Sequence, residues 1–195
     1  MSALPIREAL RRLDGLGLVE HVPHRGARVK ELSLEDLHDL YDARLHLETM
    51  VIRRAAGRFT DEAASLARTA LAEEQEAENR NDRMAAWMAH TRFHFALYEQ
   101  CGSTWLLRLI TPLWESSQRY RMRLTQLEED LPHRRAQHDR ILAACVAHDA
   151  PRAEKEIRNH LVQTADLSMR AMGGKAVFSR HFKRSRASAT PEEST

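Results

Sequence analysis

The sequence predicts an all-α protein: an antiparallel bundle of six helices, preceded by one short helix and a β-hairpin. Three observations lead to this prediction. Glycine and proline are scarce, with seven and six copies in 195 residues, and β-branched residues are few beside alanine, leucine, arginine and glutamate. This composition favours helix. Apolar residues recur at helical spacing. Only short turn-forming segments separate these stretches, and short turns join neighbouring helices antiparallel.

The front of the chain predicts a helix followed by a hairpin with a basic tip. Residues 5–17 place their apolar side chains on one helical face, with a proline in the first turn and glycines at the end. Two β-like runs, 18–22 and 27–30, flank a turn at 23–26 that contains arginine and glycine. A helix followed by such a hairpin is the second half of a winged helix-turn-helix, in which the helix is the recognition helix.

Six further helices are predicted after the hairpin. Ser33 caps the first, which extends to about Arg58, with Asp36 completing a partial capping box. Pro112 should bend or break the fourth helix. The expected starts of the other five are Thr60, Asn81 or Asp82, Ser103, Leu131-Pro132 and Ala150-Pro151.

The charge is unevenly distributed along the chain. The net charge is +2, but residues 1–30 carry six basic and three acidic residues, and residues 174–195 carry five and two. A basic front on an acidic body is typical of a nucleic-acid reader attached to a sensor, although a random surface distribution would account for it equally well. We therefore predict a partial winged-helix domain (1–30), a sensing bundle (31–173) and a basic disordered tail (174–195).

Several classes of protein are disfavoured. No apolar run reaches the roughly 18 residues of a membrane span, and no signal peptide is recognisable. The two cysteines, Cys101 and Cys145, form no metal or redox motif. We expect a cytoplasmic protein that does not associate with membranes.

Four of the 11 histidines form a candidate metal site. His90 and His94 are four residues apart and share one face of a helix. His138 and His160 lie at similar distances on either side of the turn near Asp149, so an antiparallel hairpin sets them level. Imidazole nitrogens suit Zn, Ni, Fe or Cu. The alternative is a set of separate, hydrogen-bonded histidines.

Arg44 lies close to the apolar face of the first long helix, where a buried charge needs an anionic partner. Glu48, four residues on, can be that partner. The alternative is that Arg44 binds the carboxylate of a ligand in the bundle, since guanidinium favours bidentate contacts.

These segments together resemble the FadR-like (FCD) branch of the GntR transcription regulators, to about residue 172. The residues that carry the resemblance are Ser2, Pro5-Ile6-Arg7-Glu8-Ala9-Leu10-Arg11-Arg12-Leu13, Gly17-Leu18-Val19, Pro23-His24-Arg25-Gly26, Leu32-Ser33-Leu34-Glu35-Asp36-Leu37, Tyr41, Arg44, Leu47-Glu48, Phe93-His94, His138, Ile141-Leu142, Asp149-Ala150 and His160-Leu161.

The resemblance implies an FCD-type bundle with a divalent metal ion bound by His94, His138 and His160. The family usually has aspartate or asparagine where this chain has His90. A neutral ligand there would alter the charge of the site and its metal preference. Zinc is the expected ion, with nickel, iron or manganese as alternatives.

The resemblance also implies the function: a homodimer that binds a palindromic operator and is not an enzyme. Arg7, Arg11 and Arg25 would contact DNA, and a small carboxylate effector would bind between the metal and Arg44. At the start of the recognition helix, Ala3 and Leu4 replace the polar and basic pair of the family.

The family also carries about two more helices ahead of the recognition helix. Without those helices, we expect the chain as written to bind DNA weakly. A misassigned start of the sequence is the simplest explanation for their absence. The alternatives are a ligand- and metal-binding sensor or dimerisation module without DNA binding, and a metalloenzyme.

Overall fold

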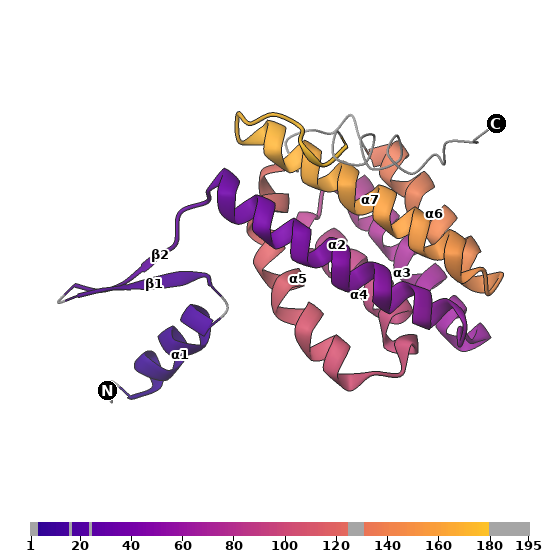
Figure 1. Ribbon diagram of the computed structural model, residues 1–195, viewed down its shortest axis with the longest axis horizontal. Coiled ribbons are helices and arrows are strands. Elements are labelled where there is room, and N and C mark those ends of the chain that lie inside the picture. Colours follow the sequence, from indigo (N-terminus) through magenta and orange to yellow (C-terminus); the bar gives the residue numbers. More distant parts are fainter. Residues whose placement is uncertain (1–3, 16, 24, 125–130, 180–195) are drawn as a thin grey trace, which may run out of the picture.

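The computed structural model describes residues 4–15, 17–23, 25–124 and 131–179. In this part of the chain, seven α-helices and one antiparallel hairpin form, and α2 to α7 make the predicted six-helix bundle (Figure 1). The elements are α1 (Leu4–Gly15), β1 (Val19–Val22), β2 (Gly26–Val29), α2 (Leu34–Ala56), α3 (Asp61–Asn79), α4 (Arg83–Tyr98), a 3₁₀ turn (Glu99–Cys101), α5 (Thr104–Leu124), α6 (Leu131–Val146) and α7 (Ala150–Ala171).

Helix α2 packs against α7 and α5, while α3 pairs with α4 and α6 with α7. The buried side of α2 includes Leu37, Tyr41, Val51 and Ile52, all fully shielded from solvent. The buried side of α3 is mostly alanine, so the α4 backbone can approach closely. Helix α4 therefore lies between α3 and the centre of the bundle, and the side chains it turns inward are the ones that the functional site uses.

The predicted helix starts are confirmed by side-chain caps. Ser33 accepts a hydrogen bond from the backbone N–H of Asp36 at 3.0 Å, and Thr60, Asp82 and Asp149 cap α3, α4 and α7 in the same way. Each such cap contributes about 1 kcal/mol to helix stability. Helix α5 is continuous through Pro112, so the predicted break is not present.

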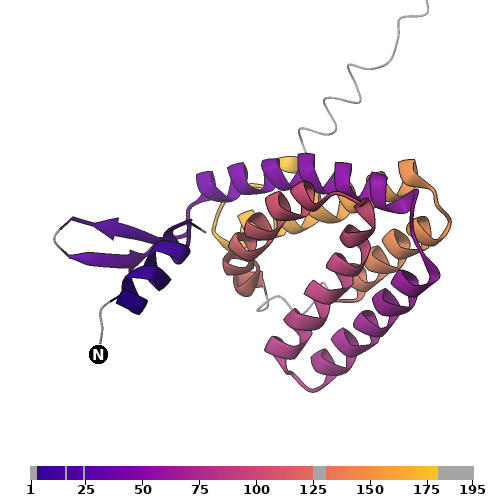
Figure 2. The same cartoon turned by 90° about the horizontal axis from the view of Figure 1, so that it is seen from below.

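The front of the chain projects from the bundle near the start of α2 (Figures 1 and 2). β1 pairs antiparallel with β2, from Val19 opposite Val29 to Val22 opposite Gly26. Helix α1 has no buried residue, and the exposed fractions of its Leu4 and Ile6 side chains are 68% and 62%. The apolar face of α1 is therefore open in the part of the chain that the structure describes.

The chain beyond α7 begins with a segment held against the bundle. The Asp166 carboxylate accepts backbone N–H groups from Val177 and Phe178 at 2.9 Å, and from Ser179 at 3.1 Å. Phe178 is buried and stacks on His38 with ring centroids 5.0 Å apart. Disorder was predicted from residue 174 onward, but residues 177–179 pack against the bundle. Residues 180–195 lie outside the described part of the chain.

Among the described residues, no helix is long and apolar enough to cross a membrane.

Candidate metal and ligand site

Four histidines predicted from the sequence come together in the centre of the bundle. His90 and His94 project from α4, His138 from α6 and His160 from α7. All four are buried, and one ligand atom from each lies within 4.8 Å of the others. The ring centroids of His138 and His160 are 4.9 Å apart, so the two helices flanking the α6–α7 turn do set these residues level. Such a cluster could hold a metal ion.

The histidines are in the neutral form that metals need. Burial lowers the pKa of each imidazole well below its usual value, and the positive charge of Arg121 lowers it further in all four. Arg44 or Arg134 also contributes at each of them, and neighbouring histidines lower the pKa at every position except His138. A neutral imidazole has a lone pair available for a cation.

Unsatisfied nitrogens in the cluster fit a cation. Both ring nitrogens of His138 and Nε2 of His94 are buried without a hydrogen-bond partner. Buried polar atoms are normally paired, because leaving them unpaired is costly. A metal ion bound to these nitrogens would remove that cost, so the residues present fit the metal that the resemblance implies.

Neighbouring side chains fix the orientation of two rings. The Tyr98 hydroxyl donates to Glu48 Oε2 at 2.5 Å, so it is an acceptor for His94 Nδ1, 3.2 Å away. His160 Nδ1 lies 2.9 Å from Gln137 Oε1. In both rings Nδ1 then carries the proton and Nε2 has the lone pair, the arrangement common in metal-binding histidines.

Arg44 forms the intrahelical pair that was the alternative to a ligand-binding role. Its Nε donates to Glu48 Oε1 at 2.6 Å, and both side chains are buried. Its Nη1, however, is buried without a partner, as is the Tyr41 hydroxyl. The Arg44 guanidinium carbon lies 5.1 Å from the Trp114 ring, and that ring packs on His94 at 4.8 Å. Arg44 therefore keeps an N–H group, close to the histidine cluster, that could donate a hydrogen bond to a ligand.

Sequence reasoning missed several residues around the cluster. Arg121 from α5 places Nη1 and Nη2 each 3.1 Å from a ring nitrogen of His90. Glu74 from α3 is buried, with Oε2 at 3.6 Å from His138 Nδ1. Arg121 follows Trp114 by seven residues, so the apolar periodicity of α5 could have revealed that both face inward.

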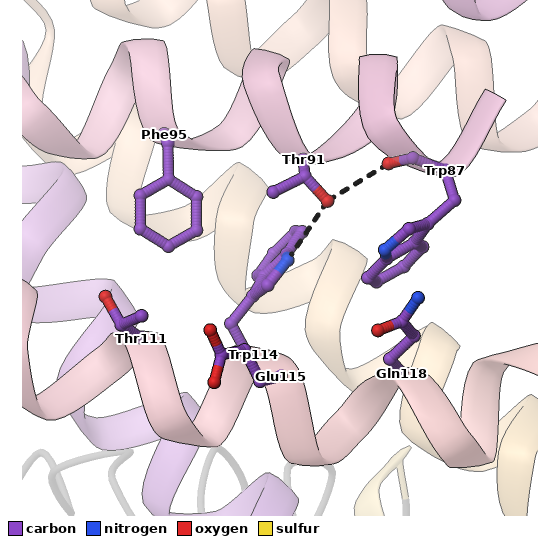
Figure 3. A pocket seen from close by; sticks show the side chains of 7 residues that line it. All are labelled: Trp87, Thr91, Phe95, Thr111, Trp114, Glu115 and Gln118. Carbon is purple, nitrogen blue, oxygen red and sulfur yellow. Dashed lines mark hydrogen bonds between the residues drawn. The ribbon is translucent and has the colours of Figure 1, made fainter. Parts of the chain in front are cut away.

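A cleft of about 400 Å³ lies between α4 and α5, next to the cluster (Figure 3). Its floor is Trp114, whose indole N–H donates to the Thr91 hydroxyl at 3.2 Å. The same indole packs on His90, with ring centroids 5.4 Å apart. Trp114 thus stands between the cleft and the histidines. The lining residues are Trp87, Thr91, Phe95, Thr111, Trp114, Glu115 and Gln118.

The predicted DNA-binding residues lie apart from this site. Arg7 and Arg11 are on α1 and Arg25 is in the hairpin turn, and all three are exposed. Two contacts connect the front to the bundle: Lys30 pairs with Asp36 of α2 at 2.7 Å, and Arg119 reaches the base of the hairpin. Arg119 of α5 donates to the backbone carbonyls of Gly17, at 3.0 Å, and Lys30.

Comparisons with known proteins agree with the fold. Residues 39–163 match the FCD domain family. The chain is 36% identical over 178 residues, 87% of its length, to the HTH-type transcriptional repressor GlaR of Escherichia coli, and covers 81% of that protein. It is 32% identical over 170 residues to the HTH-type transcriptional regulator BphR of Paraburkholderia xenovorans, which covers 83% of this chain and 68% of that protein.

Solved structures show the same fold. The match to E. coli McbR/YncC has a TM-score of 0.77 at 22% identity, and covers 86% of this chain and 80% of that one. A GntR-family regulator from Pseudomonas syringae pv. tomato matches with a TM-score of 0.59 at 22% identity, over 97% of this chain and 75% of that one.

A helical sensing bundle behind a helix and wing defines a class of proteins, the DNA-binding transcription regulators rather than enzymes. Within that class, the chain belongs to the FadR-like (FCD) branch of the GntR family.

The Tyr98 hydroxyl should contribute measurably to stability. Tyr98→Phe removes the donor to buried Glu48 and the acceptor for His94, so the free energy of unfolding should fall by about 1–3 kcal/mol. The melting temperature should fall by roughly 2–4 °C per kcal/mol. Tyr41→Phe is the matched control, since the Tyr41 hydroxyl has no hydrogen-bond partner among the described residues. Equal melting temperatures for the two variants would contradict this account of the network.

Proposed function

We propose that the bundle binds one divalent metal ion and senses a small carboxylate, and that this binding sets the protein's affinity for operator DNA. The observation that supports it is the cluster of four buried, neutral histidines with unsatisfied nitrogens. His94, His138, His160 and His90 are the proposed ligands. An all-nitrogen set favours zinc, with nickel, iron or manganese as alternatives.

A carboxylate would bind between the metal and Arg44. The buried, unpartnered Nη1 of Arg44 supports this role, because a guanidinium already paired through Nε keeps a second edge for another anion. The metal would supply positive charge for the same carboxylate. The cleft beside Trp114 offers a path from solvent once the indole turns aside.

DNA binding is proposed for the helix and wing at the front. Exposed Arg7 and Arg11 would face a major groove, while Arg25 at the hairpin tip would contact phosphate or the minor groove. A homodimer in the cytoplasm would present two such units to a palindromic operator.

Contacts of α5 would transmit the state of the sensor to the wing. Arg119 donates to the carbonyls of Gly17 and Lys30, and Tyr120 donates to Asp36 Oδ2 at 2.6 Å, in the first turn of α2. Two residues after Arg119 on the same helix, Arg121 contacts His90. A ligand that shifts this turn of α5 would therefore also shift the base of the hairpin, which gives the two sites a coupling route.

One observation favours a second candidate, a sensor or dimerisation module that does not bind DNA. The apolar face of α1 is open among the described residues, so the helix has little to hold it in a DNA-binding orientation. Selection of bound fragments from genomic DNA by the purified chain separates the two candidates. Recovery of a palindromic motif supports the regulator as written, and recovery of none supports the sensor.

Removing two of the histidines should abolish metal binding. In His138→Ala/His160→Ala, metal content by plasma mass spectrometry should drop from stoichiometric to trace. The melting temperature should also fall and become insensitive to a chelator. In the wild type a chelator should remove about 2.7 kcal/mol, the stabilisation expected at hundredfold saturation. The control, His46→Ala/His133→Ala, alters exposed rings and should keep the metal. Unchanged metal content in the first variant would overturn the site.

Removing the charge of Arg44 should remove carboxylate binding and spare the metal. Arg44→Ala alone would leave Glu48 buried and unpaired, at a cost of about 3–5 kcal/mol. The informative variant is therefore Arg44→Gln/Glu48→Gln, which keeps a neutral hydrogen-bonding pair. Calorimetric titration with acetate and succinate should show affinity at least tenfold weaker than in the wild type, about 1.4 kcal/mol.

Glu48→Gln alone is the control for that pair, because it keeps Arg44 with its unpartnered Nη1 and removes only the negative charge of Glu48. Carboxylate affinity should be retained or increased in this variant. If the double variant instead binds as tightly as the wild type, Arg44 is structural only.

Replacing Arg119 should disconnect the hairpin from the sensor. In Arg119→Ala, carboxylate affinity should remain within about twofold of the wild type, since Arg119 does not contact the cluster. Hydrogen exchange of residues 18–30 should respond to carboxylate in the wild type and no longer in the variant. Arg108→Ala, on the exposed side of the same helix, should behave as the wild type. A hairpin response that persists in Arg119→Ala would exclude this route.

A further inference from the structure

Arg121 is a buried arginine that forms no ion pair with a carboxylate in the described part of the chain, although Glu74 lies near enough to attract its charge. Its side chain is packed over the rings of Trp87 and Trp114, at 4.8 and 5.9 Å, and against both ring nitrogens of His90. Only 9% of the residue is exposed. In the part of the chain that the structure describes, no aspartate or glutamate lies within ion-pair distance of it.

The other positive charges near the cluster form ion pairs. Buried Arg44 pairs with Glu48, partly exposed Arg134 pairs with Glu74 at 3.3 Å and with Glu78, and Arg135 also pairs with Glu78. Arginine stays protonated in proteins at neutral pH, so the Arg121 guanidinium is charged. The described surroundings of the histidines therefore carry an excess positive charge located at Arg121, and an uncompensated buried charge is costly.

The proposed metal ligands do not offset this charge. All four are imidazoles, which are neutral here, and His90 stands where the family resemblance leads one to expect aspartate or asparagine. A divalent cation would add two more positive charges to the same volume. A ligand with one negative charge would leave most of this charge uncompensated, whereas a dianion would offset more of it.

We propose that Arg121 is a second anion-binding residue of this site, and that its ligand is a small dicarboxylate. One carboxylate lies between the metal and Arg44, and the other receives the Arg121 guanidinium. This inference rests on the proposed function, because it takes the carboxylate site as given. When Arg121 turns to the ligand, it also releases the His90 ring nitrogen that has the lone pair, which then becomes available to the metal.

The positions of the two arginines favour two separate carboxylates over one compact dianion. Arg44 comes from α2 and Arg121 from α5, and the Trp114 ring lies near both, at 5.1 and 5.9 Å from their guanidinium carbons. A ligand spanning this ring would have an anionic group at each end and a short chain between them. Planar guanidinium groups also match planar carboxylates.

The test compares dicarboxylates with their own monoamides, which have the same length and one charge fewer. The metal-loaded protein is titrated with linear dicarboxylates of three to six carbons, with each monoamide, and with inorganic phosphate. Calorimetry and the fluorescence of Trp87 and Trp114 report binding. In the wild type, at least one dicarboxylate should bind roughly ten- to a hundredfold more tightly than its monoamide. Arg121→Gln should reduce this ratio to about one, with metal content unchanged, while Arg121→Lys should restore part of it.

Two further variants complete the test. His90→Asp places a carboxylate beside Arg121 and should also remove the preference. Arg92→Gln removes an exposed charge on α4 and should keep it. A preference that survives both Arg121→Gln and His90→Asp overturns the inference, as does stronger binding of phosphate than of every dicarboxylate. Equal binding of dicarboxylates and monoamides by the wild type overturns only this inference. Absence of all carboxylate binding overturns the proposed function with it.

Discussion

The architecture of the bundle depends on how four imidazoles and two guanidinium groups are held in one apolar interior. Each is costly to bury alone, and the surroundings offset the cost in different ways. Glu48 neutralises Arg44, and Tyr98 and Gln137 accept from His94 and His160. Burial and the positive charges of nearby arginines lower the pKa of the imidazoles, which keeps them neutral. Some polar groups have no partner in this network, for example the ring nitrogens of His138. They belong to the site where a cation and an anion are proposed to bind.

Local sequence signals predicted the order of the helices and much of the site. Capping residues such as Ser33 and Asp149 act within one turn of the chain, so the sequence alone reveals them. His90 and His94 share a face because of helical spacing, and His138 and His160 lie level because a short turn joins their helices. These relations depend on periodicity and turn length, and neither requires knowledge of tertiary packing.

The missing parts of the site depend on packing between helices that are distant in sequence. Arg121 meets His90 across 31 positions, and Glu74 meets His138 because α3 contacts α6. No periodicity reveals which helix faces which. Arg44 shows the opposite case, since sequence offered both an intrahelical pair and a ligand contact. The structure contains the pair, yet the unpartnered Nη1 keeps the second role physically open.

One turn of α5 belongs to both halves of the protein. Its Arg119 contacts the hairpin and its Arg121 contacts the histidine cluster, so a shift of this turn of the helix would move both contacts. A ligand shifts an equilibrium only by its differential affinity for the two states. In the proposed site, the charge of Arg121 would supply this difference in affinity. A dianion would bind more tightly to the state in which Arg121 is turned toward it, and would therefore stabilise that state. Histidine at position 90, in place of the aspartate or asparagine expected from the family resemblance, would thus alter signalling as well as metal binding.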